Sequence, residues 1–182
     1  MIVDRSRFVF SGSGGQGVIT AAIILAEAAV LHENLNAVQT QSYGAAARGG
    51  TTRSDVIISD SEIYFPKVIQ PNVLVCLTQE SYNKYHRMIR PGGLLINDNR
   101  YVRSARGVDA LQKDLPIFKT VMERIGKPVV FNICMLGAVL GLTGIVRPES
   151  IIEVLKTRIP AEAIEMNRQA LDLGLELGTA VA

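Results

Sequence analysis

The chain has 182 residues, of which 48% are hydrophobic and 20% are charged, and its formal net charge is +2. This is the composition of a globular protein with a sizeable core, and the scattered basic residues do not form the concentrated positive patch of a nucleic-acid-binding protein. The two cysteines, Cys76 and Cys134, are too few to hold an iron–sulfur cluster or a structural zinc ion, each of which needs about four ligands.

The longest apolar stretches, 18–31 and 133–146, are interrupted by Glu27 and by Thr143. We predict that both are buried helices and that the chain has no membrane partner. The N-terminal sequence MIVDRSRFVF lacks the apolar core and the cleavage site of a signal peptide, so we expect a cytoplasmic protein.

An apolar strand predicted at 7–11 leads into the glycine-rich turn SGSGGQG, which opens onto an apolar helix predicted at 17–32. Gly12, Gly14 and Gly17 have the G-x-G-x-x-G spacing. Such a turn lets backbone N–H groups face a ligand, and the helix N-terminus adds a positive partial charge. The arrangement is typical of a phosphate site, although the same turn also serves as a tight connection that binds nothing.

Two familiar nucleotide sites fit this turn poorly. An NAD site has an acidic residue at the end of the second strand, where this sequence reads QTQS at 39–42. A P-loop has a lysine and a serine or threonine after its last glycine, and this turn has neither.

A second strand is predicted at 37–41, followed by the small-residue loop SYGAAARGG at 42–50. Arg48 in this loop is either an exposed cation or a ligand for a phosphate or carboxylate, which the neighbouring glycines allow to approach closely. Loops of this composition are more often a site or an interface than a plain linker. The candidate binding residues of the two segments are Gly12, Ser13, Gly14, Gly15, Gln16, Gly17, Ser42, Tyr43, Gly44, Arg48 and Gly49.

Strands predicted at 51–59 and 62–65 are expected to form a hairpin across Asp60-Ser61. Beyond it, buried strands predicted at 73–77 and 94–97 flank a helix at 79–89. This alternation predicts an α/β fold with a Rossmann-like, doubly wound, mostly parallel sheet and a hairpin addition.

The last strand is predicted at 115–118, and the rest of the chain is predicted to be helical. The helices expected there are 120–126, 132–143, one opening at Pro148, and one from Pro160 to about Leu177. In the apolar helix, Asn132 is expected to be the N-cap, and the spacing of Gly137 and Gly141 permits close helix packing.

No catalytic constellation is visible in the sequence. The serines near the two candidate loops lack a recognisable base, and neither histidine has a metal-ligand partner at a suitable spacing. We therefore predict a binding domain with no catalytic or metal-binding residue of its own.

Five segments, taken together, resemble the gamma subunit of 2-oxoacid:ferredoxin oxidoreductases. FSGSGGQGV at 10–18 resembles its opening signature, and SYGAAARGG at 42–50 resembles its second signature. The later segments that fit are PGGLLIN at 91–97, NICMLGA at 132–138 and NRQALDLG at 167–174. The resemblance covers nearly the whole chain. One residue departs from the family pattern: Ala46 stands where many members carry a carboxylate.

The resemblance implies one gamma domain over 1–182, with an α/β core over about 1–128 and a helical part over about 129–182. It also implies an enzyme complex that decarboxylates a 2-oxoacid, reduces ferredoxin and transfers the acyl group to coenzyme A (CoA). Thiamine diphosphate, Mg²⁺ and iron–sulfur clusters are expected on alpha, beta and ferredoxin-like delta partner subunits. This chain is expected to be inactive alone, with its glycine loop able to take the CoA phosphates.

Alternatives remain open at this point. The favoured substrate is 2-oxoglutarate, but pyruvate, branched-chain 2-oxoacids and indolepyruvate also fit. The chain can instead be a structural subunit whose loop binds no ligand, or a free-standing nucleotide-binding oxidoreductase, against which the missing acid argues. When isolated, its apolar helices are expected to favour a homodimer.

Overall fold

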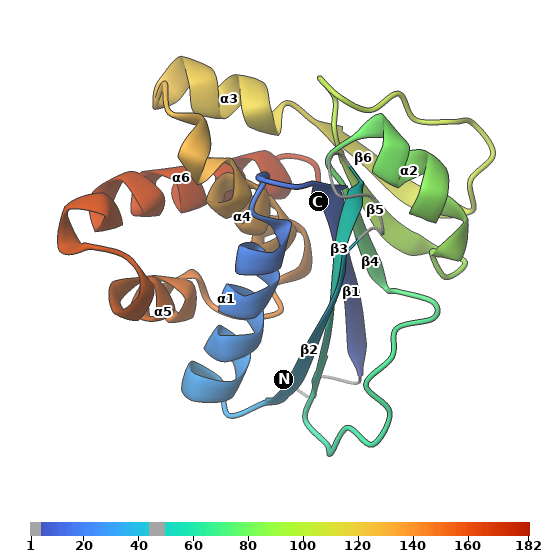
Figure 1. Cartoon of the computed structure of the whole chain (residues 1–182), viewed down its shortest axis with the longest axis horizontal. Helices are drawn as coiled ribbons and strands as arrows, with labels where there is room; N and C mark the ends of the chain where they lie inside the picture. Colours follow the sequence, from blue (N-terminus) through green and yellow to red (C-terminus); the bar gives the residue numbers. More distant parts are fainter. Residues whose placement is uncertain (1–4, 44–49) are drawn as a thin grey trace.

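A six-stranded sheet forms the centre of the protein, with helices on both faces (Figure 1). The computed structural model describes residues 5–43 and 50–182. The strands are β1 (Ser6–Ser13), β2 (Asn36–Tyr43), β3 (Thr51–Ser59), β4 (Val73–Cys76), β5 (Gly93–Asp98) and β6 (Ala110–Leu115). The helices are α1 (Val18–His32), α2 (Gln79–Tyr85), α3 (Ile117–Arg124), α4 (Phe131–Thr143), α5 (Pro148–Arg158) and α6 (Ala161–Thr179), with short 3₁₀ turns η1 (His86–Met88) and η2 (Pro128–Val130).

The strand order is β2-β3-β1-β4-β5-β6. Strands β1, β4, β5 and β6 are parallel, whereas β3 lies antiparallel between β1 and β2. The predicted α/β fold, with a mostly parallel sheet, a hairpin addition and a helical C-terminal part, is confirmed. The hairpin, however, is formed by β2 and β3.

The predicted pairing of 51–59 with 62–65 is wrong. Residues 62–65 form no strand and belong to the connection from β3 to β4. Strand β3 already has β1 on one side and β2 on the other, so it has no free edge for a third partner.

The last strand is also displaced from its predicted position at 115–118. Strand β6 ends at Leu115, and α3 begins two residues later, after Pro116 as its N-cap. The first-turn N–H of Phe118 donates to Asp98 Oδ2 at 2.7 Å, so a buried carboxylate from β5 caps this helix. The pattern ALQKDL hides β6 because an edge strand carries polar side chains that an apolar-run criterion misses.

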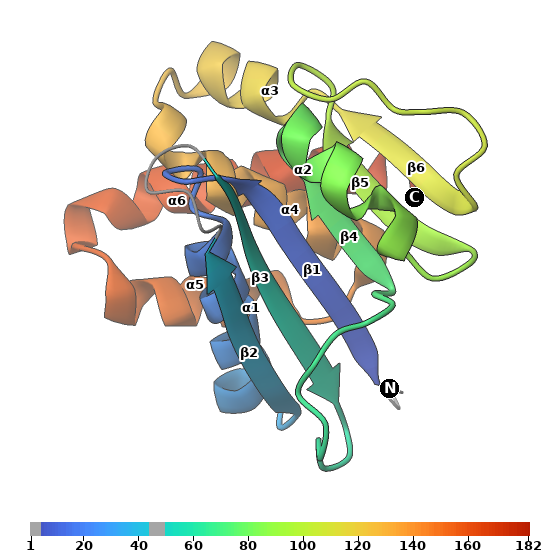
Figure 2. The same ribbon diagram turned by 45° about the vertical axis from the view of Figure 1, so that its right-hand side comes forward.

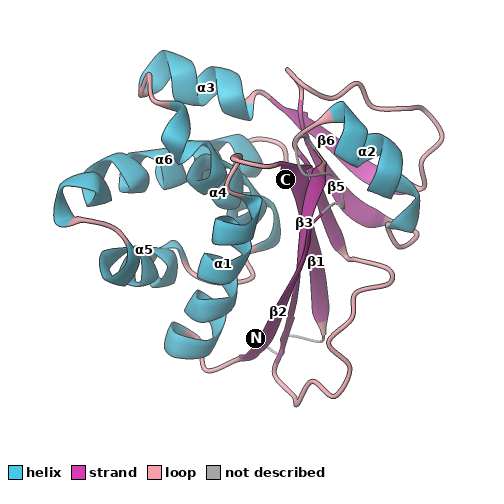
Figure 3. Cartoon of the chain, viewed as in Figure 1, coloured by secondary structure: helices cyan, strands magenta, loops and turns pink. Residues whose placement is uncertain are grey.

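Two cores lie on opposite faces of the sheet. Figure 3 shows α1, α4, α5 and α6 on one side and α2 on the other. The larger core joins β1 and β3 to α1 and α4 through side chains such as Phe8, Phe10 and Leu25. The smaller core packs Val9, Ile57 and other sheet residues against α2. No helix in the described part of the chain has both the length and the apolar character needed to cross a bilayer.

Helices α4 and α6 pack with their backbones in contact. A Cβ atom added to Gly137 would overlap the carbonyl oxygen of Leu171, and one added to Gly174 would overlap that of Cys134. A Cβ atom on Gly141 would lie 2.6 Å from the Leu175 carbonyl oxygen. The close packing predicted from the spacing of Gly137 and Gly141 is therefore confirmed.

Candidate functional site

The glycine loop lies at the point where the sheet reverses its winding. Strands β1 and β4 are adjacent and parallel, but the chain leaves β1 toward α1 on one face and leaves β4 toward α2 on the other. Figure 2 shows these two strands side by side, with α2 in front of the sheet and α1 behind it. In open α/β sheets, ligands bind in the crevice beyond the carboxyl ends of such strands.

The loop exposes backbone instead of side chains. Gly15 and Gly17 adopt left-handed conformations, with φ of +88° and +71°. A Cβ atom at Gly14 or Gly15 would have no neighbour within 4 Å, so both residues face open space. Gly15 and Gly17 therefore have backbone conformations that favour glycine, whereas Gly14 has open space beside it.

Gln16 holds the loop in place from within. Its Oε1 accepts a hydrogen bond from the backbone N–H of Ser13 at 2.8 Å, and its Nε2 donates to the carbonyl oxygen of Leu77 at 3.3 Å. A Cβ atom on Gly12 would lie 2.5 Å from the same Oε1. Gly12, Ser13 and Gln16 therefore shape the loop against the end of β4, and Gly14 and Gly15 face outward.

The N-terminus of α1 carries the positive end of a 15-residue helix. Gly17 is its N-cap and provides no side-chain acceptor, and the first turn contains no acidic residue. The first N–H within the helix that bonds to the cap carbonyl belongs to Ala21, which donates to Gly17 at 3.0 Å. The preceding N–H groups are therefore free of a side-chain cap, as in a binding site for an anion.

A cavity of about 400 Å³ adjoins this helix end. Its polar wall includes Gln16, Thr20, Asn132 and Asn167, and its other wall is apolar. The apolar residues come from α1, η2, α4, α5 and α6 and are Ile24, Pro128, Val129, Val130, Ile133, Leu155, Ile159, Pro160, Ala163 and Met166. The candidate site thus combines a helix N-terminus that has no side-chain cap with an apolar groove.

Asn132 was expected as an N-cap and has a different role. The N-cap of α4 is Val130, because η2 runs directly into the helix and places Asn132 within its first turn. The Asn132 side chain donates to the carbonyl oxygen of Gly17 at 3.4 Å and lines the cavity. Sequence reasoning missed this contact and the groove because both depend on helices far along the chain.

The second candidate segment is described in part. Ser42 and Tyr43 end β2, which runs parallel to β1 with β3 between them, so their backbone lies at the same edge of the sheet as the loop. The register pairs Thr51 with Ser13 and Thr52 with Tyr43. Gly44, Arg48 and Gly49 lie outside the described residues.

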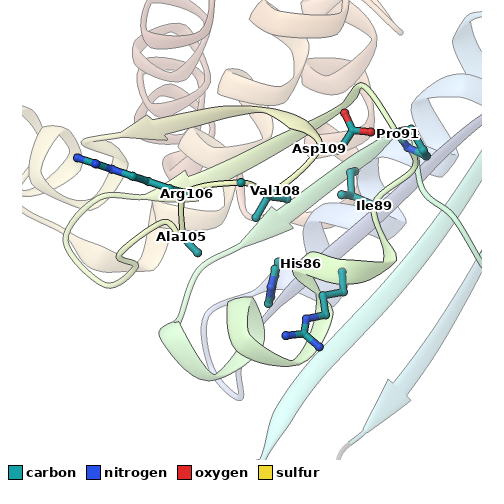
Figure 4. A pocket seen from close by; sticks show the side chains of 9 residues that line it. His86, Ile89, Pro91, Ala105, Arg106, Val108 and Asp109 are labelled. Atoms are coloured by element: carbon teal, nitrogen blue, oxygen red, sulfur yellow. The ribbon is translucent and has the colours of Figure 1, made fainter.

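A separate hollow of about 400 Å³ lies between η1 and the connection from β5 to β6 (Figure 4). His86 stacks on Tyr82 with ring centroids 4.8 Å apart, and its Nδ1 lies 2.8 Å from the Tyr82 carbonyl oxygen. In Figure 4 Arg106 extends away from His86, and Asp109 lies at the other end of the hollow. These side chains do not converge on one point, so the hollow has no catalytic arrangement.

Burial raises the pKa of three titratable side chains, Cys76, Cys134 and Asp98. Burial raises the pKa of the Cys76 and Cys134 thiols to about 12, so both remain protonated at neutral pH. Burial also raises the pKa of the Asp98 carboxyl, against the hydrogen bonds that it accepts from the backbone of Phe118 and Arg100. Among the described residues, no group of three or more His, Cys, Asp or Glu side chains could hold a metal ion.

Known proteins share this sequence and this fold. Residues 7–177 match the family model of pyruvate ferredoxin/flavodoxin oxidoreductase. The chain is 44% identical to the 2-oxoglutarate synthase subunit KorC of Methanocaldococcus jannaschii, over 95% of this chain and 94% of that protein.

Solved structures agree with this match. The crystal structure of a keto/oxoacid ferredoxin oxidoreductase gamma subunit from Geobacter sulfurreducens superposes with a TM-score of 0.89 at 37% identity, over 98% of this chain and 99% of that one. The 2-oxoglutarate:ferredoxin oxidoreductase of Magnetococcus marinus shares the fold, with a TM-score of 0.90 at 21% identity over 99% of this chain and 32% of that one. The chain therefore belongs to the pyruvate ferredoxin/flavodoxin oxidoreductase family, as a gamma-type subunit of a 2-oxoacid:ferredoxin oxidoreductase.

Proposed function

We propose that this chain is the gamma subunit of a cytoplasmic 2-oxoglutarate:ferredoxin oxidoreductase and that its glycine loop binds the diphosphate of CoA. The observation that carries the CoA assignment is the α1 N-terminus, which has no side-chain cap and lies behind the open positions Gly14 and Gly15. A diphosphate accepts hydrogen bonds from free backbone N–H groups and is stabilised by the helix dipole.

The neighbouring cavity supports CoA as the ligand. CoA joins its diphosphate to a long pantetheine arm, in which two amide groups and a hydroxyl alternate with methyl and methylene groups. The cavity begins at Gly15 to Gly17 and continues along Ile24, Ile133 and Met166, so an arm of this kind has apolar surface to cover. The Magnetococcus marinus enzyme that shares this fold was solved with CoA bound, which makes CoA the first ligand to test.

The redox chemistry is assigned to partner subunits in this proposal. The two thiols of this chain are buried, and their raised pKa does not suit thiolate ligands of a cluster. Thiamine diphosphate, Mg²⁺ and the iron–sulfur clusters are therefore proposed to lie on alpha, beta and ferredoxin-like delta subunits. On this basis the gamma chain binds the acyl acceptor and is inactive alone.

The remaining predicted contacts belong to the same proposal. The ends of β1 and β2 lie at one edge of the sheet, so Ser42 and Tyr43 are proposed to border the ligand. Gly44, Arg48 and Gly49 complete the second segment by its resemblance to the family signature, with Arg48 as a cation for a phosphate.

The test measures how a negative charge at position 14 changes the CoA affinity of the assembled complex. Gly14→Asp places a carboxylate in the open space beside the α1 N-terminus, and Gly14→Asn places a neutral group of nearly the same size there. We expect Asp to weaken CoA binding about tenfold or more relative to Asn, measured by calorimetry. Equal, wild-type CoA affinity in both variants, with assembly intact, would show that the loop only packs.

A further inference from the structure

A basic hollow lies on the face of the sheet opposite α1, above β2 and β3. It has a volume of about 410 Å³ and is lined by residues from four parts of the fold. Its cations are Arg53 from β3, Lys67 from the β3–β4 connection and Lys84 from α2. No residue of the glycine loop lines this hollow.

Arg53 is held in a fixed orientation. Its Nε donates to Asp55 Oδ1 at 2.6 Å, and its Nη2 donates to Asp55 Oδ2 at 2.7 Å and to the Val68 carbonyl oxygen at 3.0 Å. The side chain is only 19% exposed. These bonds leave Nη1 without a partner among the described residues, so a fixed guanidinium still has donors for an incoming anion.

A second cation is placed beside the first. Lys84 Nζ donates to Thr51 Oγ1 at 3.0 Å and lies 5.2 Å from the centre of the Tyr85 ring. The guanidinium carbon of Arg53 lies 5.4 Å from the centre of the same ring. Two cations therefore share one aromatic ring, and in the described part of the chain Asp55 is the one carboxylate that lines the hollow with them.

The charges in the hollow do not balance. Among the residues that the structure describes, three cations, Arg53, Lys67 and Lys84, face a single carboxylate, which leaves an excess of two positive charges. Gathering like charges in a hollow is unfavourable until an anion enters it. A phosphate monoester carries about −1.5 to −2 charges at neutral pH, which matches this excess.

The hollow is close to the glycine loop. Thr51, whose hydroxyl accepts from Lys84, is the register partner of Ser13, and Ser13 is the last residue of β1 before the loop. Neighbouring strands lie about 5 Å apart, so Lys84 is hydrogen-bonded to a residue that lies one strand spacing from the start of the loop, at the same edge of the sheet. A ligand that crosses this edge can reach both.

We infer that Lys84, Lys67 and Arg53 bind the 3′-phosphate of CoA while the glycine loop holds the diphosphate. This inference rests on the proposed CoA function of the loop. A ribose alone separates the two phosphate groups of CoA, which suits two anion sites on either side of one sheet edge. The hollow then distinguishes CoA from ligands that share its diphosphate and pantetheine but lack the monoester.

The test uses the assembled complex and two ligands, CoA and 3′-dephospho-CoA. We expect the wild-type complex to bind CoA about tenfold or more tightly than 3′-dephospho-CoA, measured by calorimetry. The double variant Lys67→Gln/Lys84→Gln is expected to lose this preference, with weaker CoA binding and unchanged binding of 3′-dephospho-CoA. The control Lys119→Gln/Lys156→Gln removes the same charge from two exposed lysines on other helices and should keep the preference.

Each outcome decides between the two assignments. If the wild-type complex binds both ligands equally, the inference is wrong and the CoA function of the loop stands. This comparison needs no variant and is therefore independent of folding defects. If the double variant weakens both ligands by the same factor, the lysines do not recognise the monoester. If neither ligand binds the wild type, the proposed function fails and the inference fails with it.

Discussion

Two features of the structure require glycine at position 17, namely the close approach of Asn132 and the backbone conformation of Gly17. Its φ of +71° is unfavourable for other residues, and a Cβ atom there would lie 2.6 Å from Asn132 Nδ2. Gly14, three residues earlier, has neither constraint. The glycine spacing in the sequence marks both positions equally, and only the structure separates Gly17, which the fold requires as glycine, from Gly14, which faces open space.

The first prediction follows from this difference. Gly17→Ala is expected to lower the free energy of unfolding by about 1–3 kcal/mol, through backbone strain and displacement of Asn132. Gly14→Ala is expected to change it by less than about 0.5 kcal/mol. Urea unfolding of the isolated chain measures both values. Equal stability of the two variants would contradict the conclusion that the fold requires glycine at position 17 but not at position 14.

Glu33 is the residue through which α1 holds the start of α5. Its Oε1 accepts hydrogen bonds from Ser150 Oγ at 2.5 Å, from the Arg147 backbone N–H at 2.9 Å and from Arg147 Nε at 3.1 Å. Burial raises the pKa of this carboxyl, but the bonds from Ser150 and Arg147 outweigh burial, and the net pKa is lowered. A lowered carboxyl pKa stabilises the fold above the pKa of the unfolded chain.

The second prediction is a pH dependence. The Glu33 contribution should be lost as the pH falls from about 5 through the lowered pKa, because the carboxylate then takes up a proton. Glu33→Gln should cost about 1 kcal/mol at pH 7 and little near pH 3. Thermal unfolding at several pH values tests this, with the exposed Glu176→Gln as control. A loss that is the same at both pH values would mean that packing, not charge, is responsible.

At the scale of elements, the α4–α6 pair shows what glycine spacing alone can predict. Gly137 and Gly141 signalled close packing, and their partners are Gly174 and Gly178 on α6. The partner helix could not be identified from the sequence, because any helix with small residues on one face can pack closely against Gly137 and Gly141. The contact is set by the whole chain, which folds α6 back against α4.

The third prediction concerns this contact. Gly137→Ala puts a methyl group onto the Leu171 carbonyl oxygen, where backbone and not a flexible side chain must move. We expect a loss of about 3 kcal/mol or more, or failure to fold. Glu165→Ala on an exposed position of α6 is the control and should be nearly neutral. Wild-type stability of Gly137→Ala in urea unfolding would mean that the helices can separate at little cost.

Elements made of continuous apolar runs were predictable from the sequence, whereas a polar edge strand and the strand pairing were not. The apolar helices at 17–32 and 132–143 and the strand at 73–77 were confirmed to within a residue, because burial alone dictates their composition. Strand β6 was misplaced because its side chains are polar, and the hairpin was misassigned because pairing depends on which strand edges remain free. The same limit applies to the site: the loop was readable locally, whereas its groove and its basic neighbours come from distant segments.

At the scale of the whole molecule, the fourth prediction concerns the assembled complex. We expect it to oxidise 2-oxoglutarate faster than pyruvate, with CoA-dependent reduction of ferredoxin, and we expect the isolated chain to show no turnover. Reduction of a ferredoxin followed by absorbance measures both, and a complex assembled without this chain is the control. Faster oxidation of pyruvate would overturn the substrate, and turnover by the isolated chain would overturn the subunit role.

The order of strands in the sheet also fixes when the glycine loop can form during synthesis. Strand β1 pairs with β3 and β4, which follow it much later in the chain, and Gln16 reaches the Leu77 carbonyl oxygen just beyond β4. The loop is thus among the first segments to leave the ribosome and among the last to be fixed, because non-local contacts must wait for their partners. A nascent chain stalled before Val73 emerges has β1 without its β4 partner. A ligand of the loop is therefore expected to bind only after β4 has paired with β1 at the centre of the sheet.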